Sequence, residues 1–185
     1  MIGTLVRVCV TGPESTGKTT LAQHLAEYAG TTWVPEASRV HAERVGRELR
    51  AAVVAPIARE HIALADAAAH RATARNARLL VLDTDLVSTV LYARHYYGAV
   101  PSWIERAERV RRATLYLLCD VDVPWVPDGV RDRPAHRQAM FALFRRALAR
   151  RGANVVVVRG EWAAREEIAR AALAAVHALV LLTPR

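Results

Sequence analysis

A glycine-rich loop lies between an apolar run and a helical pattern near the beginning of the chain. Residues 5–11 form the apolar run, residues 18–29 repeat apolar side chains at helical spacing, and the loop between them reads Gly12-Pro13-Glu14-Ser15-Thr16-Gly17-Lys18-Thr19. The loop matches GxxxxGK[ST] in the strand–loop–helix context that the pattern requires. Backbone N–H groups that point into such a loop, together with the positive end of the following helix, bind phosphate groups. We therefore expect a nucleotide-binding α/β domain built around this loop.

The side chains of the loop predict that the ligand is ATP with Mg²⁺. Lys18 is the only lysine in a chain whose other long basic side chains are all arginine. A lysine ammonium is a compact point charge, unlike the planar guanidinium of arginine. We therefore expect Lys18 to bind the β- and γ-phosphates. The hydroxyl of Thr19 is placed to bind Mg²⁺. The predicted nucleotide-binding residues of the loop are Gly12, Pro13, Glu14, Ser15, Thr16, Gly17, Lys18, Thr19 and Thr20.

Short apolar runs alternate with longer helical patterns along the whole chain. Strands are predicted at 5–11, 32–34, 79–82, 115–119 and 155–158, and helices at 18–29, 39–50, 57–78, 86–97, 102–112, 135–151 and 161–182. This alternation is typical of a parallel sheet with helices on both faces. We predict one α/β domain over residues 1–185, a doubly wound, three-layer P-loop NTPase with five parallel strands. Ligands of such sheets bind at the carboxyl ends of the strands.

Carboxylates follow the second and third predicted strands. Glu36 comes after residues 32–34, and Asp83 and Asp85 come after residues 79–82. Transfer of a phosphoryl group to an alcohol needs a carboxylate near the cation and a group that takes the proton of the hydroxyl. We predict that Asp83 binds Mg²⁺ with Thr19, and that Asp83 and Glu36 are catalytic together with Lys18. The alternatives are helix caps at Asp83 and Asp85 and an ion pair between Glu36 and Arg39.

A turn-rich segment, residues 120–134, follows the fourth predicted strand. Arg131, Arg133 and Arg137 crowd the beginning of the next helix, where the helix dipole disfavours cations. We therefore predict a lid over about residues 128–140, in which Arg131 and Arg137 bind the ATP phosphates and Arg133 is catalytic. Solvated arginines are the alternative. Trp125 lies between two prolines, either as a rigid aromatic at the mouth of the sheet or packed against its edge.

The composition narrows the choice of partners. The formal net charge is +8, but the arginines are spread along the chain with no run longer than a pair. This distribution favours solvated helix faces over a nucleic-acid site. Cys9 and Cys119 lie in apolar runs and are expected to be buried, reduced thiols of a cytoplasmic protein. We predict a small-molecule substrate, no nucleic-acid partner and no membrane span; assembly into a homo-oligomer is left open.

Four motifs in order resemble the ribosylnicotinamide kinase domain of the NadR family. They are Gly12-Pro13-Glu14-Ser15-Thr16-Gly17-Lys18-Thr19-Thr20-Leu21, Glu36-Ala37-Ser38-Arg39, Asp83-Thr84-Asp85, and Asp122-Val123-Pro124-Trp125 with Asp128-Gly129-Val130-Arg131. The similarity runs from about residue 5 to residue 160. The Pro-Glu-Ser inside the loop and the block from Asp122 to Arg131 are more selective than the loop pattern itself.

The resemblance implies a fold of nucleoside and nucleotide kinase type and transfer of the ATP γ-phosphate to the 5′-hydroxyl of nicotinamide riboside, which gives nicotinamide mononucleotide. The chain departs from NadR in having no room for the DNA-binding and adenylyltransferase domains, so we expect regulation and dinucleotide synthesis to be absent. A pyridinium riboside needs an aromatic face and nearby carboxylates. The residues expected at the acceptor are Glu36, Arg39, Asp85, Tyr96, Asp122 and Trp125. Two alternatives remain: a kinase for another nucleoside or vitamin alcohol, and a P-loop ATPase that acts as a switch.

Overall fold

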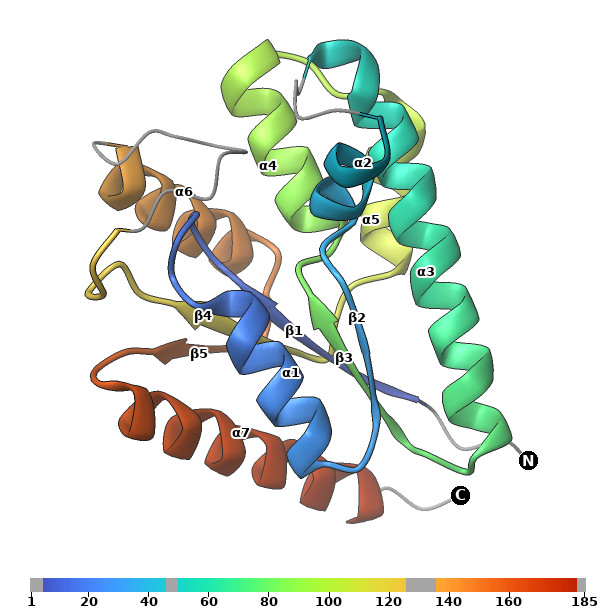
Figure 1. Cartoon of the computed structure of the whole chain (residues 1–185), viewed down its shortest axis with the longest axis vertical. Coiled ribbons are helices and arrows are strands. Elements are labelled where there is room, and N and C mark those ends of the chain that lie inside the picture. Colours follow the sequence, from blue (N-terminus) through green and yellow to red (C-terminus); the bar gives the residue numbers. More distant parts are fainter. Residues whose placement is uncertain (1–4, 46–49, 126–135, 183–185) are drawn as a thin grey trace.

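Five parallel strands form a single sheet in the computed structural model, which describes residues 5–45, 50–125 and 136–182. The strands are β1 (Val6–Thr11), β2 (Thr32–Val34), β3 (Leu79–Asp83), β4 (Leu115–Cys119) and β5 (Val155–Val158). Their order across the sheet is β2-β3-β1-β4-β5 (Figure 1). Because β2 and β3 lie on one side of β1 and β4 and β5 on the other, the strand order reverses beside β1. Ligands of doubly wound sheets bind in the crevice at such a point.

Helices cover both faces of the sheet. The helices are α1 (Lys18–Tyr28), α2 (Ala37–Val45), α3 (Val54–Ala74), α4 (Leu86–Tyr97), α5 (Ser102–Val110), α6 (Arg137–Arg150) and α7 (Trp162–Leu182), with a 3₁₀ turn at Ala51–Val53. In Figure 1, α1 and α7 lie on one face of the sheet and α3, α4 and α6 on the other. α5 packs on α3 and α4. This arrangement confirms the predicted three-layer fold. Among the described helices, none combines the length and apolar character needed to cross a bilayer.

β1 is buried on both of its faces. Val8 and Val10 pack with α1 and α7, whereas Cys9 packs with α3, α4 and α6 on the opposite face. A parallel strand covered on both sides reads as a continuous apolar run instead of an alternating one, which is why residues 5–11 could be recognised. Cys9 and Cys119 are both buried and free, as predicted.

Several helix boundaries differ from the prediction: α2 begins at Ala37 instead of residue 39, α3 begins at Val54 instead of residue 57, and α5 ends at Val110 instead of residue 112. α3 was expected to continue to residue 78 but ends at Ala74, because Asn76 adopts a left-handed φ of 55° and the Ala77 N–H turns back to the Ala72 carbonyl, 2.9 Å away. Ser102, the first residue of α5, does not cap that helix. The cap position is Pro101, and the Ser102 hydroxyl accepts from Arg106 at 3.1 Å.

Candidate active site

The loop after β1 has the backbone conformation of an anion-binding nest. Ser15 and Gly17 have left-handed φ angles of 52° and 76°, and Gly17 is the cap residue of α1. Gly12 has a φ of 136°, and a Cβ there would lie 2.8 Å from the Cys119 carbonyl oxygen. A larger residue at Gly12 would therefore collide with β4. The loop thus combines the left-handed φ angles of a nest with the positive end of a helix, an arrangement that binds phosphate.

Lys18 is buried and folded back onto this loop. Its Nζ donates to the Pro13 carbonyl at 2.6 Å, and the Thr16 hydroxyl donates to the same oxygen at 2.8 Å. The ammonium is therefore held at the rim of the nest by a main-chain oxygen. An ammonium on a flexible stem can exchange that single carbonyl for phosphate oxygens with little rearrangement.

Thr19 and Asp83 meet at the carboxyl end of the central strands. The Thr19 hydroxyl donates to Asp83 Oδ2 at 2.7 Å. Asp83 is 1% exposed, and its Oδ1 is buried without a hydrogen-bond partner among the described residues. Mg²⁺ is usually held by one or two protein oxygens together with substrate phosphates. A buried carboxylate oxygen with unused capacity beside a hydroxyl fits such an ion.

The carboxyl of Asp83 is electrostatically coupled to Glu36. Burial raises the pKa of Asp83, the negative charge of Glu36 raises it further, and Lys18 opposes both effects. Glu36 is itself buried, immediately before α2, and its Oε1 accepts a hydrogen bond from Ser38. A raised pKa makes the Asp83 carboxylate a better proton acceptor. The two acids predicted to be catalytic therefore influence one another through their charges.

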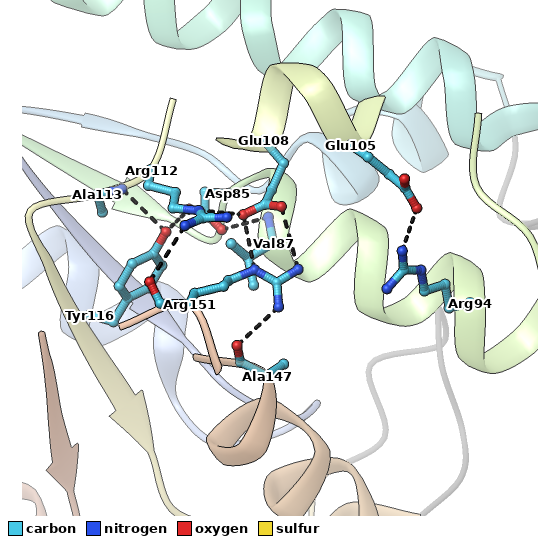
Figure 2. A network of polar contacts seen from close by, with 10 residues as sticks. All are labelled: Asp85, Val87, Arg94, Glu105, Glu108, Arg112, Ala113, Tyr116, Ala147 and Arg151. Atoms are coloured by element: carbon cyan, nitrogen blue, oxygen red, sulfur yellow. Dashed lines mark hydrogen bonds and ion pairs between the residues drawn. The ribbon is translucent and has the colours of Figure 1, made fainter. Parts of the chain in front are cut away.

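Asp85 caps α4 from a fully buried position. Its Oδ1 accepts from the Val87 N–H at 2.9 Å, and its Oδ2 accepts from the Tyr116 hydroxyl at 2.7 Å (Figure 2). Burial raises the pKa of Asp85 to about 6, and the hydrogen bond from Tyr116 limits that rise. The capping alternative is confirmed. Because both oxygens already bind groups of the protein, the predicted contact of Asp85 with the acceptor gains no support from this geometry.

Glu108 joins two arginines next to the Asp85–Tyr116 pair. Arg112 Nε and Arg151 Nε donate to Glu108 Oε1 at 2.9 and 3.0 Å (Figure 2). Burial alone would raise the pKa of Glu108, but the hydrogen bonds from Arg151 and Arg112 outweigh it and lower the pKa. This network ties the end of α5 to the end of α6.

Removing the Tyr116 hydroxyl should destabilise the fold. In Tyr116→Phe, Asp85 Oδ2 and the Ala113 N–H, which is 3.2 Å from the same hydroxyl, both lose a buried partner. We expect a loss of about 1–3 kcal/mol in the free energy of unfolding, measured by urea denaturation. Tyr28→Phe is the matched control, because Tyr28 is 59% exposed. Equal losses in the two variants would contradict this role of the hydroxyl.

The residues predicted for the acceptor and the lid differ in their surroundings. The Tyr96 hydroxyl lies 3.3 Å from Glu14 Oε1, which brings α4 against the phosphate loop. Trp125 Nε1 is buried without a hydrogen-bond partner among the described residues. Asp122, in contrast, forms an ion pair with Arg165 and accepts from the Gly160 N–H at 2.6 Å. Arg131 and Arg133 lie outside the described residues, as does most of the predicted lid.

Arg137 and Arg165 both donate hydrogen bonds to carbonyl groups of the phosphate loop. Arg137 donates to the carbonyls of Ser15 and Val123, each at 3.0 Å, so the structure shows it on the loop itself. Arg165 was not among the predicted site residues, although it is 1% exposed and donates to the Thr16 carbonyl at 3.2 Å. A signal was present: Arg165 shares a helical stripe with apolar residues that are all buried in the core, Ala169, Leu173 and Val176.

Comparison with known proteins places the chain among P-loop domains. Residues 7–165 match a family model described as an AAA domain. Over 128 residues, 67% of its length, the chain is 31% identical to the trifunctional NAD biosynthesis/regulator protein NadR of Escherichia coli K12, and equally to that of Salmonella typhimurium LT2. These segments are 30% of each NadR protein, so the chain corresponds to only part of its curated relatives.

Solved structures show the same fold. A NadR protein in complex with NR superposes with a TM-score of 0.73 at 25% identity, covering 98% of this chain and 53% of that one. A NadR protein with NAD and AMP-PNP gives 0.68 at 22% identity, covering 98% of this chain and 51% of that one. Thymidylate kinase from Ehrlichia chaffeensis gives 0.64 at 15% identity, covering 95% and 99% of the two chains. These likenesses show that the chain shares the fold of these proteins.

Proposed function

The chain belongs to the AAA domain family, and we propose that it transfers the γ-phosphate of ATP to the 5′-hydroxyl of nicotinamide riboside. The observation that carries this proposal is the pairing of Asp83 with Thr19 at the foot of the phosphate loop, with Glu36 close enough to raise the pKa of Asp83. A nucleotide on the loop would present its γ-phosphate to these acids. Similarity to NadR, including a NadR structure in complex with NR, supports the choice of acceptor.

Each residue of the site has a distinct task in this reaction. The N–H groups of the loop and Lys18 bind the phosphates of ATP. Mg²⁺ bound at Thr19 and Asp83 would neutralise charge on the transferred group. The 5′-oxygen of the riboside bonds to the γ-phosphorus while the bond from that phosphorus to the β–γ bridging oxygen breaks. The hydroxyl proton passes to a carboxylate, which we assign to Asp83, and ADP leaves.

The acceptor pocket is proposed to lie between α2 and α4. Glu36 precedes α2, and Tyr96, on α4, contacts Glu14 of the phosphate loop. Tyr96 also stacks on Tyr92, with ring centroids 5.9 Å apart, which fixes the plane of its ring. An aromatic face and a carboxylate suit a positively charged pyridinium. We propose that Glu36, Arg39, Tyr96 and Trp125 contact the riboside, and that Arg133 acts on the phosphates.

The acceptor can be identified by supplying candidate alcohols. With ATP and Mg²⁺, the purified chain should convert nicotinamide riboside to its mononucleotide, followed by chromatography of the product. A panel of other ribosides and vitamin alcohols, and a sample without acceptor, serve as controls. Turnover of another alcohol, with no mononucleotide at millimolar riboside, would move the assignment to that alcohol. ATP hydrolysis that is equally fast without any acceptor would indicate a switch instead of a kinase.

A further inference from the structure

Two arginines from outside the phosphate loop hold successive carbonyl groups of that loop. Arg137, the first residue of α6, donates to the Ser15 carbonyl at 3.0 Å. Arg165, on α7, donates to the Thr16 carbonyl at 3.2 Å. These contacts join parts of the chain that are 122 and 149 residues apart. Neither arginine belongs to the GxxxxGK[ST] pattern.

The direction of a carbonyl group fixes the direction of the next N–H group. No cis peptide bond occurs among the described residues, and in a planar trans peptide the C=O and the following N–H point in opposite directions. A Ser15 carbonyl held by Arg137 therefore turns the Thr16 N–H away from that arginine. In the same way, a Thr16 carbonyl held by Arg165 turns the Gly17 N–H away. Both N–H groups belong to the nest that Ser15 and Gly17 form with their left-handed φ angles.

We propose that Arg165 and Arg137 are positioning residues that aim the N–H groups of Thr16 and Gly17 at the phosphates of a bound nucleotide. They act through the loop, from the side opposite to the ligand. The inference rests on nucleotide binding in the proposed function, but it does not depend on which alcohol accepts the phosphate. It also gives Arg137 a task different from the direct phosphate contact expected from the sequence.

Arg165 is anchored well enough to serve as a fixed support. Its Nε donates to the Gly160 carbonyl at 2.8 Å, and its remaining donors bind the Asp120 carbonyl at 3.3 Å and the Asp122 carboxylate. Asp122 in turn accepts from the Gly160 N–H. The guanidinium thus connects the loop after β1 with the chain after β4 and after β5. Arg137 adds a second anchor through the Val123 carbonyl.

The cost of burying a guanidinium argues for a task beyond stability. A buried charge loses its hydration, and well-packed apolar residues in its place are often as stable or more so. Arg165 occupies a position on the apolar stripe of α7 where Ala169 and Leu173 lie further along. An apolar side chain there would fill space but could not hold the Thr16 carbonyl. Arg165 orients the loop, and an apolar residue in its place would not.

Ligand binding by arginine variants tests this inference directly. Arg165→Met and Arg137→Met remove the donors but keep an unbranched side chain. The dissociation constants of Mg·ATP and of inorganic triphosphate are measured by calorimetry, because triphosphate carries only the groups that the loop binds. We expect each variant to raise both constants by about tenfold, the effect of a lost hydrogen bond to a charged group. The KM for the acceptor at saturating ATP should stay unchanged.

A matched control separates orientation from stability. Arg151 forms the same kinds of contact, with Glu108 and with the Ala147 carbonyl, but none of them is with the phosphate loop (Figure 2). Arg151→Met should lower the melting temperature without changing either dissociation constant. If Arg165→Met does not fold, Arg165→Lys and Arg137→Met test the inference in its place. Arg165→Lys is suitable because lysine keeps the charge but lacks the multiple donors of arginine.

Two outcomes would overturn the inference. One is unchanged binding of ATP and triphosphate in the folded arginine variants. The other is an equal loss of binding in Arg151→Met, which would reduce the effect to stability alone. The proposed function can fail separately: a wild-type chain that binds ATP but does not phosphorylate nicotinamide riboside would refute the acceptor and leave the inference about the loop standing.

Discussion

Replacing Lys18 with alanine should lower kcat/KM for ATP by about 10²–10³-fold, the loss typical of removing one preorganised group that stabilises transition-state charge. Lys18 is the only lysine of the chain, and its Nζ lies 2.6 Å from the Pro13 carbonyl at the rim of the nest. The variant keeps the loop backbone and the beginning of α1, so its melting temperature should stay close to that of the wild type. Steady-state kinetics at varied ATP measure the effect.

Lys18→Arg is the informative companion variant. A guanidinium keeps the positive charge but is planar and larger, and it cannot approach the loop as a compact ammonium does. We expect Lys18→Arg to recover only a small part of the lost activity. Activity near the wild-type level in Lys18→Ala would remove the loop from the reaction altogether. Full recovery in Lys18→Arg would mean that charge alone is required there.

The features that could be predicted from the sequence have local signals. The boundaries of β2, β4 and β5 follow from short apolar runs. The boundaries of α4 follow from Asp85, which caps its beginning, and from Gly98, which ends it with a left-handed φ of 73°. The phosphate loop is recognisable because its glycines, its lysine and its threonine are fixed in spacing by one backbone conformation. The prediction that Thr19 and Asp83 share a cation implied that they are neighbours, and the hydrogen bond between them confirms this proximity.

The features that were missed depend on contacts between distant segments. Nothing near Tyr116 in the sequence indicates that its hydroxyl binds Asp85, because 31 residues separate them and their pairing depends on strand order. The support of Thr16 by Arg165 spans 149 residues. Asp122 was assigned to the acceptor as a carboxylate near the aromatic Trp125, whereas the buried charge of Arg165 holds it in an ion pair. Without Asp122, the buried guanidinium of Arg165 would lack a counter-charge, which is costly.

The two acids beside the γ-phosphate site should respond differently to amide substitution. Asp83 ends a central strand, accepts from Thr19 and has a second oxygen without a hydrogen-bond partner among the described residues. Glu36 follows the edge strand β2, and one of its oxygens accepts from Ser38. We therefore assign the cation shell and the 5′-hydroxyl to Asp83 and the riboside pocket to Glu36. A positioned base contributes about 10²–10⁴-fold to the rate.

Asp83→Asn should therefore lower kcat by about 10²–10⁴-fold at saturating ATP and acceptor, because the amide can neither take the proton nor carry the negative charge that faces Mg²⁺. Glu36→Gln keeps its shape and should mainly raise the KM for the acceptor. Both constants are measured over a range of Mg²⁺ concentrations, so that a weakened cation site appears as a shifted requirement for Mg²⁺.

A larger fall in kcat for Glu36→Gln, with Asp83→Asn changing only the Mg²⁺ requirement, would reverse the two roles. If neither variant changes kcat by about tenfold, a loss smaller than a positioned base contributes, both carboxylates are structural. Because Asp85 already binds Val87 and Tyr116, the base would then have to come from the segment that follows β4.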